Sequence, residues 1–417
     1  MELRESIQVR GKFDTVLLFT TAALVLIGVL MVYSSTSVVP PTARTGSSTG
    51  GIAGDSIPGA PANFNLIDVR YLKKHLASVL LGIVLMVIAY KLPIGIYRER
   101  ATEILVVTLV LLIAVNLPVI GLTVNGARRW LRIWHFTFQP SEAVKLAVVL
   151  VMARYLSGPS FKTDEFKSFL KPIVLMVCIQ AVLLRQPDFG SAAIIGMITF
   201  CLLFIAEVRL TYILSVGLAF IPVVIKLVRQ PYRLKRVLVF LDPWADEKNS
   251  GFQLIQSFVA LGNGGIQGVG LGKSMQKLFF LPESKTDFIF AIIGEEIGLL
   301  GAVFVICLFA LFFIRAISIM NRLRDRFMFF MASGITLLIV LQALINMCVV
   351  TGMVPTKGLP MPFISYGGSS MIINLAEVGL LLNLASNADV TWSESSAQRT
   401  TTKMFNQRKA RVFSYDK

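Results

Sequence analysis

The chain has 417 residues, of which 55% are hydrophobic and only 15% are charged. About 25% of the residues of a soluble domain are charged, so the composition predicts a polytopic membrane protein and excludes an ordinary soluble enzyme. The formal net charge is +16. Because the basic residues are spread over many loops, they favour anionic lipid surfaces and anionic lipid-linked substrates over nucleic acid.

Apolar runs of about 17–25 residues, the length that crosses a bilayer, recur along the whole chain. The predicted spans are 14–34, 73–90, 103–120, 141–157, 169–185, 190–206, 210–227, 287–314, 327–350 and 368–386. The first run is about long enough to span and lacks a small-residue cleavage site, which argues against a signal peptide. We therefore predict an all-α polytopic membrane protein with about ten transmembrane helices and a membrane domain over residues 14–387.

Basic residues predict the orientation of these spans. Lys and Arg gather in the N-terminal segment 1–13, in the short loops 91–100 and 315–326, and in the tail 388–417. Cytoplasmic loops carry an excess of Lys and Arg, so both terminal segments are predicted to be cytoplasmic. The tail is polar and basic throughout, and we expect it to be disordered.

Three of the predicted outer loops have features of their own. Residues 37–64 are rich in Pro, Gly, Ser and Thr and cannot bury a core, so we expect a disordered first outer loop. Residues 228–286 form a large outer loop between the seventh and eighth spans. That loop and the short loop 121–139 are both basic although the positive-inside rule disfavours cations there. Cations on this side indicate an anionic ligand.

Asp287 stands where the large loop ends and the eighth apolar run begins. A helix dipole stabilises the carboxylate and partial burial opposes ionisation, so Asp287 could be a base that accepts a hydroxyl proton. The alternative is an N-terminal helix cap, a position that Asp favours. Glu295 lies roughly 12 Å deeper on a helix that rises 1.5 Å per residue. Glu295 and Glu296 are therefore predicted to be structural groups inside the bundle.

Arginines and tryptophans alternate in the short loop 121–139. Arg128, Arg129 and Arg132 stand beside Trp130 and Trp134. Guanidinium groups bind phosphates with paired hydrogen bonds and indoles favour the membrane interface, so this segment suits a headgroup pocket. A surface belt of snorkelling arginines and anchoring tryptophans is the alternative.

Other polar residues lie inside predicted spans. Glu142 and Lys145 are three residues apart on one helix face and most simply pair with each other, with a substrate contact by Lys145 as the alternative. Asp188 follows a proline at a span start, a position that local helix initiation explains. Glu377 has no partner on its own helix and is expected to be hydrogen-bonded inside the bundle.

Cysteine and histidine argue against disulfides, cysteine metal ligands and histidine-based metal or triad chemistry. The four cysteines (Cys178, Cys201, Cys307 and Cys348) lie in apolar runs and are expected to be small buried hydrophobes. Only two histidines are present. The glycine run 262–272 does not match a nucleotide-binding register, so we expect close backbone approach or a flexible loop. The Pro- and Gly-dense segment 352–370 predicts a re-entrant loop that closes a cleft, or else a tight outer turn.

Taken together, short blocks along the chain resemble one known family. They are NGARRW at 125–130, QPSE at 139–142, QPDFG at 186–190, DPW at 242–244, SGFQ at 250–253, the glycine run, residues 281–298, PTKG at 355–358 and ISYGGSS at 364–370. In this order they resemble the SEDS family (shape, elongation, division and sporulation) of peptidoglycan polymerases. PTKG and the IGEE at 293–296 are similar to the cell-division branch, FtsW, rather than to the elongation branch, RodA.

The resemblance implies a ten-helix glycosyltransferase that polymerises lipid II at the outer face of the bacterial inner membrane, at the division septum. It places the essential acid of the family at Asp287, as general base on the acceptor hydroxyl, with undecaprenyl pyrophosphate leaving. Basic residues of the outer loops would stabilise the pyrophosphate. The candidates for substrate binding are Arg128, Arg129, Trp130, Arg132, Lys145, Arg233, Lys273, Lys277, Lys357 and Ser369, with Glu142, Asp188, Glu295 and Glu296 as supporting residues.

The resemblance also implies partners. A single-pass class B penicillin-binding transpeptidase (FtsI-like) and other divisome proteins are expected, and nucleic acid is not. No cofactor is certain, and a divalent cation (Mg²⁺ or Mn²⁺) is a candidate without a visible ligand cluster. Many relatives carry His where Lys285 stands here, so no histidine role carries over. A lipid II flippase and a non-catalytic divisome scaffold are the alternative functions.

Overall fold

The computed structural model describes residues 13–36, 69–117, 120–124, 127–133, 136–247, 251–278, 281, 283–356 and 358–388. The predictions for residues 1–12, for the loop 37–64 and for the tail beyond residue 388 lie outside the described residues. The same holds for Lys357, for Trp134 and for the side chain of Arg233.

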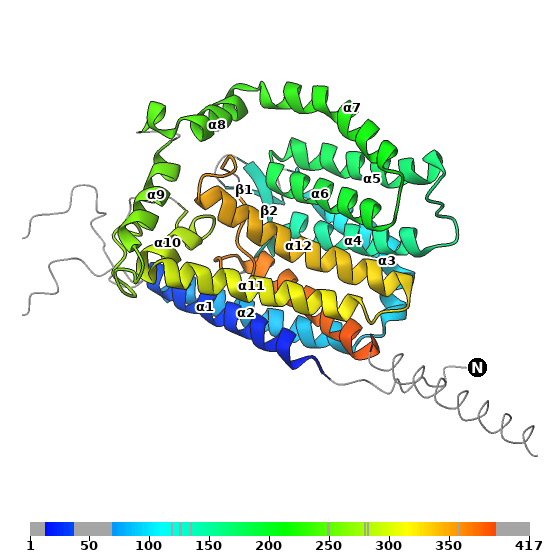
Figure 1. Ribbon diagram of the computed structural model, residues 1–417, viewed down its shortest axis with the longest axis horizontal. Helices are drawn as coiled ribbons and strands as arrows, with labels where there is room; N and C mark the ends of the chain where they lie inside the picture. Colours follow the sequence, from blue (N-terminus) through cyan, green and yellow to red (C-terminus); the bar gives the residue numbers. More distant parts are fainter. Residues whose placement is uncertain are drawn as a thin grey trace, which may run out of the picture.

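The described residues form a bundle of helices (Figure 1). In chain order the helices are α1 (Thr15–Thr36), α2 (Val69–Lys91), α3 (Ile94–Ala114), α4 (Pro140–Ser157), α5 (Phe166–Arg185), α6 (Phe189–Ile205), α7 (Leu210–Val228), α8 (Pro231–Leu241), α9 (Phe252–Gly264), α10 (Ile289–Glu296), α11 (Gly298–Met320) and α12 (Arg326–Val350). A short 3-10 helix covers Pro243–Asp246, and an unlabelled last helix covers Gly368–Ala388.

Six described helices are long and apolar enough to cross a membrane, which makes the chain a multi-pass membrane protein. They are α1, Tyr71–Lys91 of α2, α5, α11, α12 and the last helix. The last helix and α12 are the most buried of the six, so they form the centre of the bundle. Leucine and phenylalanine side chains on α1, α7 and α11 are exposed, as expected for surfaces that face lipid.

The predicted span 287–314 is wrong as a continuous helix. The structure breaks it into α10 and α11 at Gly298, whose φ of +76° is the left-handed conformation that favours glycine. The backbone of Gly268 lies against Gly298 at this break, and Val269 N and Gly270 N donate to Glu295 O and Glu296 O at 2.9 Å. Close backbone approach is therefore the role of the glycine run, as one of the two alternatives predicted.

A small sheet departs from the predicted all-α description. β1 (Gly121–Val124), β2 (Ala127–Ile133) and β3 (Phe136–Phe138) pair antiparallel in that order. Side chains alternate between the two faces of a strand, and this separates the neighbouring arginines of β2. Arg128 and Arg132 are exposed, whereas Arg129 is half-buried and Leu131 is buried.

Three further expectations need correction. The third helix begins at Ile94 and ends at Ala114 rather than spanning 103–120, because Pro93 starts it earlier. The large loop 228–286 holds α8 and α9. Cys178 and Cys307 are exposed on the bundle surface instead of buried.

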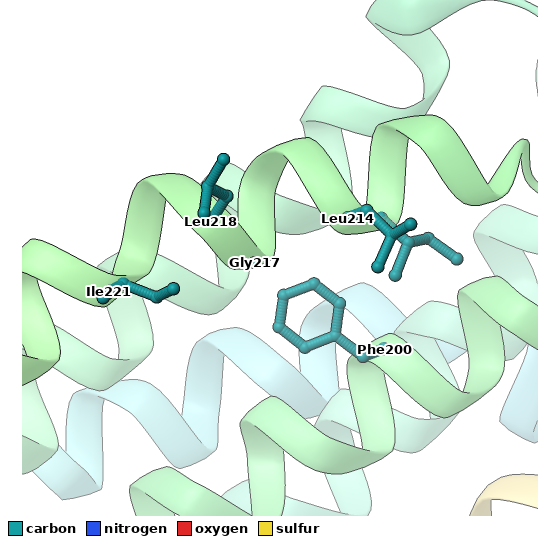
Figure 2. Close-up of a pocket in the computed structure, with 6 residues that line it drawn as sticks. Phe200, Leu214, Gly217, Leu218 and Ile221 are labelled. Atoms are coloured by element: carbon teal, nitrogen blue, oxygen red, sulfur yellow. The ribbon is translucent and has the colours of Figure 1, made fainter.

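An apolar groove of about 490 Å³ runs between α6 and α7. Figure 1 shows α7 at the edge of the bundle. Phe200, Ile213, Leu214, Gly217, Leu218 and Ile221 line it (Figure 2). These walls suit hydrocarbon and offer no side chain that could carry out chemistry, so the candidate active site lies elsewhere.

Candidate active site

The backbone before α10 is fixed by three consecutive hydrogen bonds. Lys285 O accepts from Tyr366 N at 2.9 Å, Thr286 O from Ser365 Oγ at 2.5 Å and Asp287 O from Asn346 Nδ2 at 2.8 Å. The donors belong to the segment 358–366 and to α12. The irregular backbone that carries Asp287 is therefore held from two directions.

The Asp287 side chain does not cap α10. The N-cap residue of α10 is Phe288, and it makes no side-chain capping bond. The Asp287 side chain is partly exposed, and Gly358 lies so close that a Cβ there would come within 3.1 Å of Asp287 Oδ2. The helix-cap alternative is thus wrong, and the carboxylate lies against the backbone of Gly358. Asp287 together with Thr356 and residues 358–360 is called the recess.

The surroundings of Asp287 raise its pKa from the ordinary 3.8 to about 7. Burial is the largest cause, because dense protein displaces water that would stabilise the charged form. The negative charge of Glu283 adds to the rise, and the positive charges of Arg236 and Arg129 oppose it. A carboxylate with a pKa near the working pH suits general base catalysis.

Two arginines from distant parts of the chain are held near Asp287. In β2, Arg129 donates through Nε to Gln186 O at 2.9 Å and through Nη2 to Pro187 O at 2.7 Å. In α8, Arg236 donates through Nη1 to Thr356 O at 3.1 Å. Both guanidinium groups are oriented by backbone carbonyls, so they are positioned before a ligand arrives.

Residues 359–365 of the segment 352–370 are almost entirely buried in protein. Leu359, Met361, Phe363 and Ile364 are each at most 2% exposed. Ser365 accepts from Met361 N at 2.7 Å and thereby closes the backbone of this segment. Irregular backbone at membrane depth requires such burial, so the structure favours the re-entrant loop over an exposed tight turn.

The remaining predicted substrate-binding residues fall into two groups. Arg128, Arg132 and Lys273 are exposed and Trp130 is half-buried, and they remain candidates. Ser369 is buried, accepts from Gln139 N at 2.9 Å and donates to Thr137 O at 3.1 Å. It ties the last helix to β3, which makes it a structural residue in this fold.

Lys145 and Lys277 both lie in buried ion pairs. Lys145 Nζ is 2.8 Å from Glu142 Oε1, and Lys277 Nζ is 2.8 Å from Glu296 Oε1. The lysine side chains are 0% and 1% exposed, so neither ammonium reaches a headgroup without breaking its pair. We therefore assign both lysines a structural role, and their predicted role as substrate ligands stays a prediction.

The Lys277–Glu296 pair gives a test of this reassignment. Glu296→Gln leaves a buried ammonium without its counter-charge, which typically costs about 3–5 kcal/mol. We expect a large drop in thermal unfolding temperature in detergent, and partial recovery in the double variant Glu296→Gln/Lys277→Met, which removes both charges. An unchanged unfolding temperature in Glu296→Gln would contradict the structural role.

The other acidic residues are placed as follows. Asp188 is the N-cap of α6 and accepts from Ser191 N at 3.2 Å. Glu295 accepts hydrogen bonds from Ser274 Oγ and, at 3.1 Å, from Met275 N. Both were predicted to be supporting residues, and in this structure each accepts from a backbone N–H group. Glu377 differs from its prediction, because neither carboxyl oxygen has a hydrogen-bond partner in the described part of the chain.

Sequence reasoning missed three residues around Asp287. Arg236 was one of many loop cations, and nothing in the sequence shows that α8 brings it to the segment 355–360. Glu283 stands four residues before Asp287, and that spacing within one polar turn could have suggested proximity. Asn346 appeared only as an apolar-span residue, although a buried amide in a span commonly marks a specific partner.

No group of three or more His, Cys, Asp or Glu side chains that could hold a metal ion is found in the described residues. Glu283 and Asp287 are the two carboxylates that lie near each other here. Mg²⁺ is commonly held by one or two carboxylates together with substrate phosphates and water, so a cation here would depend on a phosphorylated substrate for most of its ligands.

Comparison with known proteins identifies the family. The model of the cell cycle protein family FtsW/RodA/SpoVE matches residues 60–389. The chain belongs to this family. A Geobacter sulfurreducens relative named "Probable peptidoglycan glycosyltransferase FtsW" is 39% identical over 387 residues, which cover 92% of this chain and 98% of the relative. A Coxiella burnetii protein of the same name is 39% identical over 378 residues, covering 89% and 96%.

Solved structures share the fold. A chain from a peptidoglycan synthase complex, described as coordinating polymerization and crosslinking, superposes with a TM-score of 0.71 at 27% identity, covering 90% of this chain and 98% of that one. The Thermus thermophilus rod shape determining protein RodA superposes with a TM-score of 0.63 at 24% identity, covering 89% and 96%.

Proposed function

We propose that the protein is a peptidoglycan glycosyltransferase that polymerises lipid II, and that Asp287 is its general base. The observation that carries this proposal is a recessed carboxylate with a pKa near 7 flanked by two oriented arginines. Family membership and the names of relatives that align over nearly their full length support it.

The chemistry follows from this arrangement. The acceptor sugar hydroxyl donates its proton to the Asp287 carboxylate, and the hydroxyl oxygen attacks the anomeric carbon of the donor. The bond from that carbon to the pyrophosphate oxygen breaks, and undecaprenyl pyrophosphate leaves with the electron pair. Arg129 and Arg236 would stabilise the charge that develops on the pyrophosphate. A divalent cation that arrives with the pyrophosphate would supply further charge stabilisation.

The finer features of the family complete the proposal. It comprises ten spans with both termini in the cytoplasm, and the segments 37–64 and 228–286 on the outer face. We place the protein at the division septum of the inner membrane, together with a class B transpeptidase that cross-links the new strand and with other divisome proteins. The solved synthase complex that couples polymerization to crosslinking supports this pairing.

The two alternative functions predict different behaviour of purified protein. Protein and its transpeptidase partner are reconstituted with labelled lipid II, and both glycan polymer and transfer of label across liposomes are measured. The proposal predicts polymer. Transfer of label without polymer would establish a flippase. If neither polymer formation nor transfer of label is observed, the result supports the non-catalytic scaffold.

The opposite charges of Glu283 and Arg236 predict opposite shifts of the Asp287 pKa when each is removed. Glu283→Gln removes a repulsive charge, so the pKa of Asp287 falls and the acid limb of the pH–rate profile moves to lower pH. Arg236→Gln removes an attractive charge and moves the limb to higher pH, with a lower plateau rate because pyrophosphate stabilisation is lost. Polymerisation assayed between pH 5 and 9 with both variants checks this. Shifts in the same direction would contradict the electrostatic account.

A further inference from the structure

Two amide side chains on α12 bind backbone carbonyls in and beside the candidate active site. Gln342 and Asn346 are one helical turn apart and are 0% and 2% exposed. Gln342 accepts from Lys145 Nζ and donates to Pro360 O, both at 2.8 Å. Asn346 Nδ2 donates to Asp287 O and to Leu359 O, again both at 2.8 Å.

The orientation of the Asn346 amide is fixed by its partners. Both are backbone carbonyls, which can only accept, so the nitrogen and not the oxygen must face them. Asn346 Oδ1 is buried and has no hydrogen-bond partner in the described residues. A buried acceptor without a partner costs free energy, and this cost is borne while both Nδ2 hydrogens stay on the two carbonyls.

Those two carbonyls belong to the two walls of the recess. Asp287 carries the carboxylate, and Leu359 follows Gly358, whose backbone lies against Asp287 Oδ2. The second wall also includes Thr356, whose carbonyl anchors Arg236 at 3.1 Å. The single amide of Asn346 therefore joins Asp287 to the segment that anchors Arg236.

We propose that Asn346 is a positioning residue for the glycosyl transfer, and that it acts by fixing the Asp287 carboxylate against the wall that anchors Arg236. The proposal rests on the assignment of Asp287 as general base. Gln342 braces the same wall one turn away through Pro360, and the buried Lys145–Glu142 pair holds Gln342. Asn346 itself touches no reacting atom in this scheme.

The last helix offers a matched control. Asn383 Nδ2 also donates to two backbone carbonyls, Ala89 O at 3.1 Å and Leu92 O at 2.6 Å, and Asn383 is 4% exposed. These bonds join the last helix to the end of α2, with no member of the candidate site. Replacing Asn346 or Asn383 by Leu keeps the branched shape of the side chain and removes the same number of donors. Asn383→Leu also removes the acceptor of Asn387 Nδ2 at 2.9 Å, so the structural loss in the control is at least as large.

The test compares Asn346→Leu with Asn383→Leu in the full-length protein with its transpeptidase partner and lipid II. We expect Asn346→Leu to lower kcat by about 10²-fold, the typical cost of misplacing a catalytic group by 1 Å, with KM little changed. Its acid limb should move to higher pH, because the carboxylate moves away from the positive charge of Arg236. Asn383→Leu should keep the wild-type limb and a kcat within about threefold of wild type. Equal kcat and equal limbs in the two variants would overturn the proposal.

Two additions keep this test decisive. Asn346→Ser retains one donor and should give an intermediate kcat if Asn346→Leu does not fold. Infrared titration of the Asp287 carboxyl reports positioning without turnover, and an unshifted titration in the Asn346 variants would also overturn the proposal. Failure of the glycosyltransferase proposal would look different, because the wild-type protein itself would then form no polymer.

Discussion

Replacing Asp287 by Asn is expected to lower glycan polymer formation by about 10²–10⁴-fold, the usual contribution of a general base. Asparagine has the same shape as aspartate but cannot accept the acceptor hydroxyl proton. Polymer length and yield from labelled lipid II measure the effect, and Asp164→Asn is the control. Asp164 is an exposed aspartate that pairs with Arg209 at 2.9 Å, away from the recess. Equal polymer yield from Asp287→Asn and wild type would contradict the assignment.

The same substitution separates loss of chemistry from loss of fold. The pKa of Asp287 is raised in the folded protein from 3.8 to about 7. A raised pKa means that the folded state favours the protonated group. The stability it contributes is present below pH 4 and is lost as the pH rises through 7. The Asp287→Asn variant has no carboxyl group to ionise at this position, so it does not lose this stability as the pH rises. Its thermal unfolding temperature should therefore match or exceed that of wild type at pH 8.

The second large effect is the pH dependence of the wild-type rate. The base must be ionised to act, so the plateau is expected above pH 7 and the rate should fall about tenfold per unit below the pKa. At pH 5 we therefore expect a rate about 100-fold below the plateau. The assay is polymerisation at saturating lipid II, with lipid II binding measured at each pH. A flat rate from pH 5 to 8 would contradict a base with this pKa.

Much of the fold follows from the sequence because hydrophobic length and position determine the spans. The runs that became α1, α5 and α12 were placed within a few residues. The Glu142–Lys145 pair follows from spacing on one helix. The predicted span 287–314 failed because apolar composition continues through Gly298, where a tertiary contact with Gly268 breaks the helix.

The candidate site was predictable only in part. Asp287 stands at a loop-to-helix junction that the sequence makes visible, and the family blocks point to it. Arg236 and Asn346 could not be found, since their roles depend on α8 and α12 both meeting the segment 355–360. The arginines of the short loop 121–139 looked equivalent, but strand alternation turns Arg129 toward Gln186 and leaves Arg128 exposed.

The central claim is that the protein fold poises Asp287 as a base near neutral pH, and titration of that carboxyl group tests it most directly. Infrared difference spectra of wild type minus Asp287→Asn, recorded from pH 4 to 9, isolate the carboxyl band of this residue. We predict that it titrates with a pKa near 7 and that this value coincides with the acid limb of the rate profile. A carboxyl that titrates near its ordinary value of 3.8, or a rate profile that does not follow it, would contradict the account.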